Sequence, residues 1–208
     1  MVNTLSSNSM LKSSFFFPGA ANSTTKLVSV SLMFTAGTFT LKRSIPPIQS
    51  GFKNSSINDG NGTVDCNGHG THVAATAAGT KYGVAKNARV VPVRLLNCAG
   101  SGQYSGVIAA LDWILSPENP NPKTQAVLNL SIGGAGSASM NAAILRLTNA
   151  GITVVAAAGN ESTDACTRSP ASAPSAITVG ATTLMDTPAS YSNQGKCVDI
   201  FAPGSSIL

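Results

Sequence analysis

The chain has 208 residues, a hydrophobic share of 43% and a formal net charge of +5. The whole net charge belongs to residues 1–58, where five basic residues are scattered and Asp and Glu are absent. Nucleic-acid binding usually requires a dense basic cluster, and the apolar stretch 27–41 is too short and too polar to span a bilayer. We therefore expect neither a nucleic-acid partner nor a membrane partner.

Residues 1–58 are rich in Ser, Thr and Asn and show no clear helical or strand period. A transit peptide is one interpretation of a Ser-rich, acid-poor leader, although Arg43 is its only arginine. Phe15-Phe16-Phe17 is followed at once by Pro18-Gly19, which argues against a signal peptide. We expect a disordered or mistranslated leader over 1–58 and a partial domain over 59–208.

The second segment alternates short apolar runs with helical patterns. The runs are typical of buried parallel strands; they are 88–96, 126–130 and 152–157. Apolar residues at helical spacing and glycine stop signals predict helices; these are 69–78, 107–115 and 140–149. Strands that alternate with helices predict an α/β domain whose parallel sheet has helices on both faces.

Gly68-His69-Gly70-Thr71-His72 is the most informative stretch of the chain. Histidine titrates near pH 7 and can act as a general base, and the small neighbours of His69 let a substrate approach closely. The stretch resembles the histidine motif of the subtilisin-like serine proteases, in which the first His is the general base. We assign this role to His69. His72 lies one turn further on, and we expect it to be a packed core residue.

The resemblance covers residues 59–208 and is closest to the aqualysin-like members of the proteinase K branch. Further motifs carry it: Tyr82–Ala85, Val93–Leu96, Gly100–Gly102, Leu130–Gly134, Val155–Asn160 and Ala202–Gly204. It implies a subtilisin-like fold, truncated at its C-terminus, and a secreted, extracellular serine endopeptidase. The partners would be peptide or protein substrates, and we expect a monomer.

Two motifs of the catalytic triad are not found where the resemblance requires them. In subtilisin the Asp lies about 30 residues before the His and the Ser about 155 after it. The chain has Thr38-Phe39-Thr40 at the first position and ends at Leu208 before the second. We therefore expect a serine endopeptidase by family whose 208-residue polypeptide is itself inactive. The alternative to an endopeptidase is a non-catalytic peptide-binding relic or a gene-model fragment.

The resemblance also assigns the binding residues. Asn160 would donate its amide to the oxyanion that develops on the scissile carbonyl, which is worth about 3–4 kcal/mol; the alternative is an Asn in a plain turn. The walls of the primary specificity pocket would be Ser131, Ile132, Gly133, Ala157, Ala158 and Gly159. An edge strand that pairs with extended peptide would be Gly100, Ser101 and Gly102. These residues are small and uncharged, which favours apolar or aromatic substrate residues.

The four cysteines allow three interpretations. The aqualysin-like pattern pairs Cys66 with Cys98 and Cys166 with Cys197, which implies an oxidising compartment. Four reduced thiols, or a zinc site in which His69 and His72 join Cys66 and Cys98, stay open as alternatives.

Calcium is the ion that the resemblance implies, in a structural role. Its ligands would be Asp199 and the backbone carbonyls near Pro174 and Ala176, since calcium prefers hard oxygen ligands. A solvated surface carboxylate is the alternative for Asp199.

Overall fold

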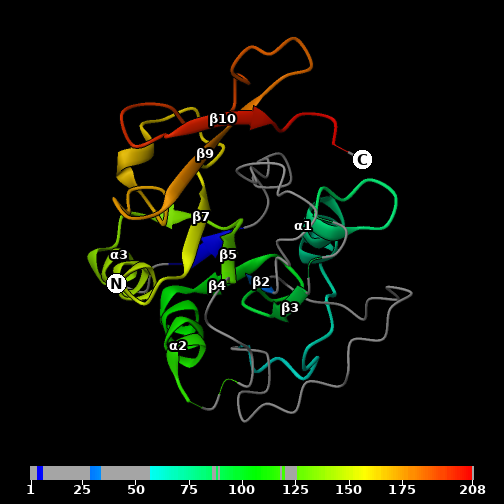
Figure 1. Cartoon of the computed structure of the whole chain (residues 1–208), viewed down its shortest axis with the longest axis vertical. Coiled ribbons are helices and arrows are strands. Elements are labelled where there is room, and N and C mark those ends of the chain that lie inside the picture. The colour runs from blue at the N-terminus through cyan, green and yellow to red at the C-terminus, as the bar shows by residue number, and fades with distance from the viewer. Residues whose placement is uncertain are drawn as a thin grey trace.

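The computed structural model describes residues 57–85, 88, 90–117, 119 and 126–207, together with the backbone of 4–6 and 29–33. Its centre is a six-stranded sheet in the order β10-β9-β7-β5-β2-β3 (Figure 1). Every neighbouring pair in this sheet is parallel. The strands are β2 (Ser29–Met33), β3 (Val90–Val93), β5 (Ala126–Leu130), β7 (Thr153–Ala157), β9 (Ile177–Thr182) and β10 (Ile200–Pro203).

Helices cover both faces of the sheet, with α2 and α3 on one side and α1 on the other (Figure 1). Short strands and one short helix complete the fold. The helices are α1 (His69–Ala78), α2 (Tyr104–Leu115), α3 (Ala138–Asn149) and the 3-10 helix η1 (Ala165–Thr167). The short strands are β1 (Thr4–Ser6), β4 (Ser101–Gln103), β6 (Gly134–Ala135) and β8 (Arg168–Ser169). The expected α/β fold with a parallel sheet is confirmed.

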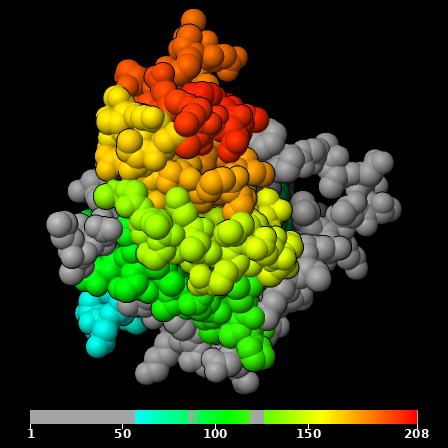
Figure 2. Space-filling model, turned by 90° about the vertical axis from the view of Figure 1, so that its left-hand side faces the viewer, coloured from blue at the N-terminus to red at the C-terminus, as the bar shows by residue number. Residues whose placement is uncertain are grey.

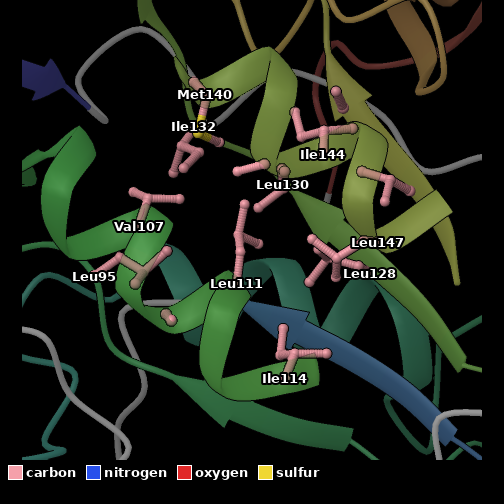
Figure 3. Close-up of a cluster of buried hydrophobic side chains, with 14 of the residues drawn as sticks. Leu95, Val107, Leu111, Ile114, Leu128, Leu130, Ile132, Met140, Ile144 and Leu147 are labelled. Atoms are coloured by element: carbon pink, nitrogen blue, oxygen red, sulfur yellow. The ribbon is translucent and has the colours of Figure 1, made fainter. Parts of the chain in front are cut away.

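The main hydrophobic core fills the space between α2, α3 and one face of the sheet (Figure 3). Its centre is completely buried and contains Leu111, Leu128, Leu130, Ile144 and Leu147. Alternate residues of each strand point to opposite faces, so the neighbours of these strand residues pack on the other side of the sheet. Both faces are apolar, which explains why the strands appear in the sequence as continuous apolar runs.

The predicted element boundaries agree closely with the structure for β5 and α1, which begin and end at the predicted residues. Helix α3 begins two residues earlier than predicted because the Ser137 hydroxyl accepts a hydrogen bond from the Met140 amide at 3.3 Å. Such a cap satisfies one of the free amides of the first turn. Strand β3 is shorter than predicted and ends at Val93.

Part of the segment that we expected to be a leader lies inside the sheet. Strand β2 is hydrogen-bonded between β3 and β5, with Val30 opposite both Val90 and Val127. The alternation of Ser29-Val30-Ser31-Leu32 is a strand signal that the serines obscured. Apart from the backbone of β1 and β2, residues 1–56, including Thr38-Phe39-Thr40, lie outside the described residues, and the domain boundary at 58/59 stays a prediction.

The connection between β9 and β10 projects from the molecule and is the orange tip in Figure 2. Leu184 and Met185 in this connection are 80% and 82% exposed, so they contribute nothing to the core. None of the helices in the described part of the chain combines the length and the apolar character that a bilayer span requires.

Candidate active site

The carboxyl ends of β5 and β7 lie side by side, and the segments that follow them contain the predicted pocket walls. Leu130 is opposite Ala156, so Ser131–Gly133 and Ala158–Asn160 leave the same edge of the sheet. In open α/β sheets this edge is where ligands bind. Ile132 packs its side chain into the main core, so this residue can contribute only its backbone to a binding surface.

His69 is the first residue of α1 and is 2% exposed. Gly68 precedes it in the left-handed conformation, with φ of 88°, which glycine adopts without strain. His72 is half-buried, and its Nε2 lies 3.4 Å from the carbonyl oxygen of Ile207. Residue 207 follows β10, so the first turn of α1 lies at the carboxyl edge of the sheet.

Asp65 fixes the start of α1, a role that the sequence analysis missed. Its carboxylate accepts hydrogen bonds from the Gly68 amide at 2.8 Å, the Thr71 amide at 2.8 Å and the Thr71 hydroxyl at 2.7 Å. These bonds satisfy free amides of the first turn, where a negative charge is also favoured by the helix dipole. Because His69 lies between the two bonded residues, Asp65 restrains its backbone. An Asp shortly before the first helical residue was the available signal.

An ion pair joins the segment before the histidine motif to the end of β3. Arg94 is completely buried and donates to both carboxylate oxygens of Asp59, at 2.7 and 2.5 Å, and to the carbonyl oxygen of Gly62 at 3.1 Å. Two parallel bonds between a guanidinium and a carboxylate are strong and directional. The Arg94 guanidinium holds the pKa of the Asp59 carboxyl well below its usual range.

Acid should therefore destabilise the protein through Asp59. Its pKa is lower in the folded than in the unfolded chain, where it is about 4. The stabilisation is thus present above pH 4 and is lost as pH falls from about 4 toward the folded-state pKa. Urea unfolding between pH 6 and pH 2 measures this loss. Asp59→Asn should reduce the slope of the unfolding free energy against pH in this range. Equal slopes below pH 4 in both proteins would show that the ion pair does not contribute.

Both disulfides have the pairing that the resemblance implied. Cys66 is bonded to Cys98 and Cys166 to Cys197, with Cα–Cα distances of 4.9 and 5.2 Å. The alternatives of four reduced thiols and of a zinc site are wrong in this structure, because each of these sulfurs forms a disulfide bond. The first disulfide joins the loop before His69 to the turn before β4.

The loop that carries Asn160 is held by Asn193, a completely buried residue. The Asn193 side chain donates to the Ala158 carbonyl at 2.9 Å and to the Glu161 carboxylate at 2.7 Å. Its oxygen accepts from the amides of Glu161 and Thr163 at 3.1 and 2.9 Å. The Glu161 carboxylate in turn accepts a hydrogen bond from the backbone amide of Asn160 at 3.1 Å, which leaves the side chain of Asn160 out of this contact. The backbone on both sides of Asn160 is therefore fixed.

Gly159 fits closely against Asn193. The glycine has φ of 103°, and a Cβ atom at this position would lie 2.3 Å from the Asn193 side-chain nitrogen. The Asn193 amide also donates to the Gly159 carbonyl at 3.0 Å. The contacts of Asn193 with a loop 30 to 35 residues earlier leave no periodic signal in the sequence, so the sequence analysis missed them.

Strand β4 contains two of the three predicted edge residues, and Gly100 precedes it. The Ser101 amide and carbonyl bond to Asn97, at 3.1 and 2.8 Å. Gly102 is buried, and a Cβ atom here would lie 2.2 Å from the Leu95 carbonyl oxygen. Only glycine therefore fits at the middle of this strand.

Tyr104 connects β4 to β6 and β8. It directly follows β4, and its hydroxyl lies 2.8 Å from the carbonyl oxygens of both Ala135 and Ser169. Burial raises the pKa of Tyr104 to about 12, so its hydroxyl keeps its proton as a hydrogen-bond donor at neutral pH. Tyr104 thus fixes the separation between the two short strands.

Asp199 lies beside the start of β9. Its carboxylate accepts from the Thr178 amide at 2.7 Å, and its own amide donates to the Thr178 carbonyl at 2.9 Å. Ala176 is two residues before Thr178, and Pro174 is exposed. Carboxylate and main-chain carbonyl oxygens are the hard ligands that calcium prefers, and the assignment of Asp199, Pro174 and Ala176 to a calcium site stays a prediction.

Comparison with known proteins identifies the class. The sequence profile of the subtilase family, Peptidase S8, matches residues 33–207. The chain belongs to this family of serine-type peptidases.

The relatives agree with this classification. The chain is 54% identical over 152 residues to an extracellular serine proteinase of Thermus sp. (strain Rt41A), covering 73% of the chain and 36% of the relative. It is 50% identical over 143 residues to alkaline serine exoprotease A of Vibrio alginolyticus, covering 69% and 26%. The crystal structure of a cold adapted subtilisin-like serine proteinase matches with a TM-score of 0.73 and 36% identity, covering 94% of this chain and 70% of that one. The match therefore spans about a third of the length of the first sequence relative and about a quarter of the second.

Proposed function

We propose that the chain is part of a secreted serine endopeptidase of the proteinase K branch, closest to its aqualysin-like members. The observation that best supports this is the pairing of Leu130 with Ala156. It sets Ser131–Gly133 beside the strand end that carries Asn160. His69 opens a helix at the same edge of the sheet.

In the proposed mechanism, an extended peptide pairs with β4 and places an apolar or aromatic side chain between Ser131–Gly133 and Ala157–Gly159. The nucleophile is the serine of the family, which the 208 residues do not contain in its motif. Its hydroxyl attacks the scissile carbonyl carbon and its proton passes to His69, which then gives the proton to the leaving amine. The side-chain amide of Asn160 donates a hydrogen bond to the oxyanion that forms.

Calcium would be held by Asp199 and the backbone carbonyls of Pro174 and Ala176. The ion would supply positive charge that joins the start of β9 to the segment before β10. Such a ligand stabilises the folded chain because it binds the folded form alone.

Secretion and a monomeric state complete the proposal. Two disulfides in a chain of this size are typical of an oxidising compartment, and one relative is named an extracellular proteinase.

The test compares the 208-residue polypeptide with an extended chain. The extension supplies a family-like Asp segment before Asn58 and a tail with Gly-Thr-Ser-Met-Ala after Leu208. We expect the extended chain to cleave peptide substrates and to react with a serine-directed phosphonylating reagent, and the 208-residue polypeptide to do neither. Labelling of the 208-residue polypeptide, with proteolysis abolished by His69→Ala, would contradict the expected inactivity. Peptide binding without cleavage by the extended chain would favour a non-catalytic binding protein.

A further inference from the structure

An ion pair lies between the two walls that we assign to the primary specificity pocket. Arg168 of β8 is opposite Ala135 of β6, and β6 directly follows the wall Ser131–Gly133. The Nε atom of Arg168 lies 3.6 Å from the Glu161 carboxylate. A pocket with small and uncharged walls therefore has two charged side chains beside it.

The carboxylate of this pair lies against the opposite wall, which ends at Gly159. A Cβ atom at Gly159 would lie 2.7 Å from the Oε2 atom of Glu161. The same oxygen accepts hydrogen bonds from the Asn160 backbone amide at 3.1 Å and from the Asn193 side chain at 2.7 Å. Since Glu161 belongs to one wall and Arg168 lies on the strand that pairs beyond the other, the ion pair bridges the two walls.

The Arg168 guanidinium keeps hydrogen-bond donors for a ligand. Its 3.6 Å separation from Glu161 exceeds the about 2.7–2.9 Å of a close charge-assisted hydrogen bond. Within the described part of the chain, no acceptor takes a hydrogen bond from either Nη group of Arg168. Both side chains are 29% exposed, so the guanidinium is partly shielded from water and still accessible. Such a group is suited to bind a carboxylate through two parallel hydrogen bonds.

We propose that Arg168 gives the primary specificity pocket a second preference, for glutamate, beside its preference for apolar and aromatic side chains. The inference rests on the proposed function, which places the substrate side chain between these walls. The methylene groups of a substrate glutamate contact the small wall residues, and its carboxylate accepts hydrogen bonds from the Nη groups of Arg168. Glu161 remains on the Nε side of the guanidinium and repels the substrate carboxylate, which limits the preference.

Removal of the guanidinium from the extended chain tests this preference. The substrates are two peptide anilides that differ in the residue before the scissile bond, which is glutamate in one and phenylalanine in the other. We expect Arg168→Ala to lower kcat/KM for the glutamate substrate about 10- to 100-fold, as for the loss of a hydrogen bond to a charged group, and to change the phenylalanine value less than about threefold. Arg168→Lys should retain part of the glutamate activity, because it keeps the charge without the planar fork.

A variant of the opposing carboxylate should act in the other direction. Glu161→Gln removes the negative charge and keeps an oxygen that can accept from Asn160 and Asn193, so kcat/KM for the glutamate substrate should rise about 3- to 10-fold. Arg146→Ala is the matched control, because it removes the same charge from an exposed ion pair with Asp112 on the helices α3 and α2. The measurement is the ratio of the glutamate to the phenylalanine kcat/KM, in which a general loss of activity cancels.

The outcomes separate this inference from the proposed function. A parent chain that cleaves only the phenylalanine substrate, or a ratio that Arg168→Ala leaves unchanged or lowers no more than Arg146→Ala does, would overturn the role of Arg168, while the endopeptidase would stand. If the parent chain cleaves neither substrate, the proposed function is wrong, and calorimetry with acetyl-Ala-Ala-Ala-Glu-amide decides the site. Binding that Arg168→Ala alone abolishes would support a glutamate site, whereas no binding, or equal binding by parent and variant, would overturn it.

Discussion

Replacing His69 by alanine in the extended chain should lower kcat by on the order of 10⁶, because base and nucleophile act as one unit. Without the imidazole, no group removes the proton of the attacking hydroxyl. KM should stay nearly constant, since β4 and the segments after β5 and β7 are untouched. The measurement is the steady-state hydrolysis of a peptide anilide with an aromatic residue before the scissile bond.

Two further variants are comparisons for the effect of His69→Ala on kcat. His72→Ala, one turn away on the same helix, should change kcat by only a few fold, because His72 has no chemical role in the proposed mechanism. Asn160→Ala should lower kcat by about 10²–10³ with KM unchanged, as expected for the loss of one oxyanion donor. Comparable losses for His69→Ala and His72→Ala would show that α1 had been disrupted and would remove the support for His69 as the base.

Removing the disulfide between Cys166 and Cys197 should lower the free energy of unfolding by about 3–4 kcal/mol in the chain-entropy model. The bond closes a loop with a sequence separation of 31, which the unfolded chain must otherwise explore. This loss is a large share of the stability of a typical domain. Urea unfolding of Cys166→Ala/Cys197→Ala, monitored by circular dichroism, measures it.

The other disulfide is the matched comparison. Its sequence separation is 32, so Cys66→Ala/Cys98→Ala should cost nearly the same in unfolded-chain entropy. A larger loss for this pair would locate additional folded-state stabilisation near Asp59 and Arg94. Unfolding free energies that equal the parent value in both variants would contradict the stabilising role of the disulfides.

Local patterns of the sequence were sufficient to predict most strands of the sheet and most helices. β5 is a short apolar run and α1 an alanine-rich stretch that ends at a glycine, so both were predicted at their observed bounds. The histidine motif and the other short motifs indicated the family, and the resemblance then implied the cysteine pairing. None of these patterns depends on contacts with distant parts of the chain.

The missed features depend on such contacts. Arg94 meets Asp59 across 35 residues, and Asn193 meets Glu161 across 32. Both residues are polar and completely buried, an environment that side-chain chemistry alone does not predict. β2 was missed because its alternate serines look like a polar linker. Polar residues also occur in the neighbouring described strands, where Asn129 and Thr178 are buried.

The place of β2 in the sheet has a consequence for shorter versions of this chain. Without residues 29–33, β3 and β5 would lose their common neighbour and each would present a row of unpaired amides and carbonyls. Open edges of this kind recruit strands from other molecules. A fragment that starts at residue 59 would therefore tend to aggregate. The solubility of the domain would depend on residues 29–33, which belong to a segment that composition alone marks as dispensable.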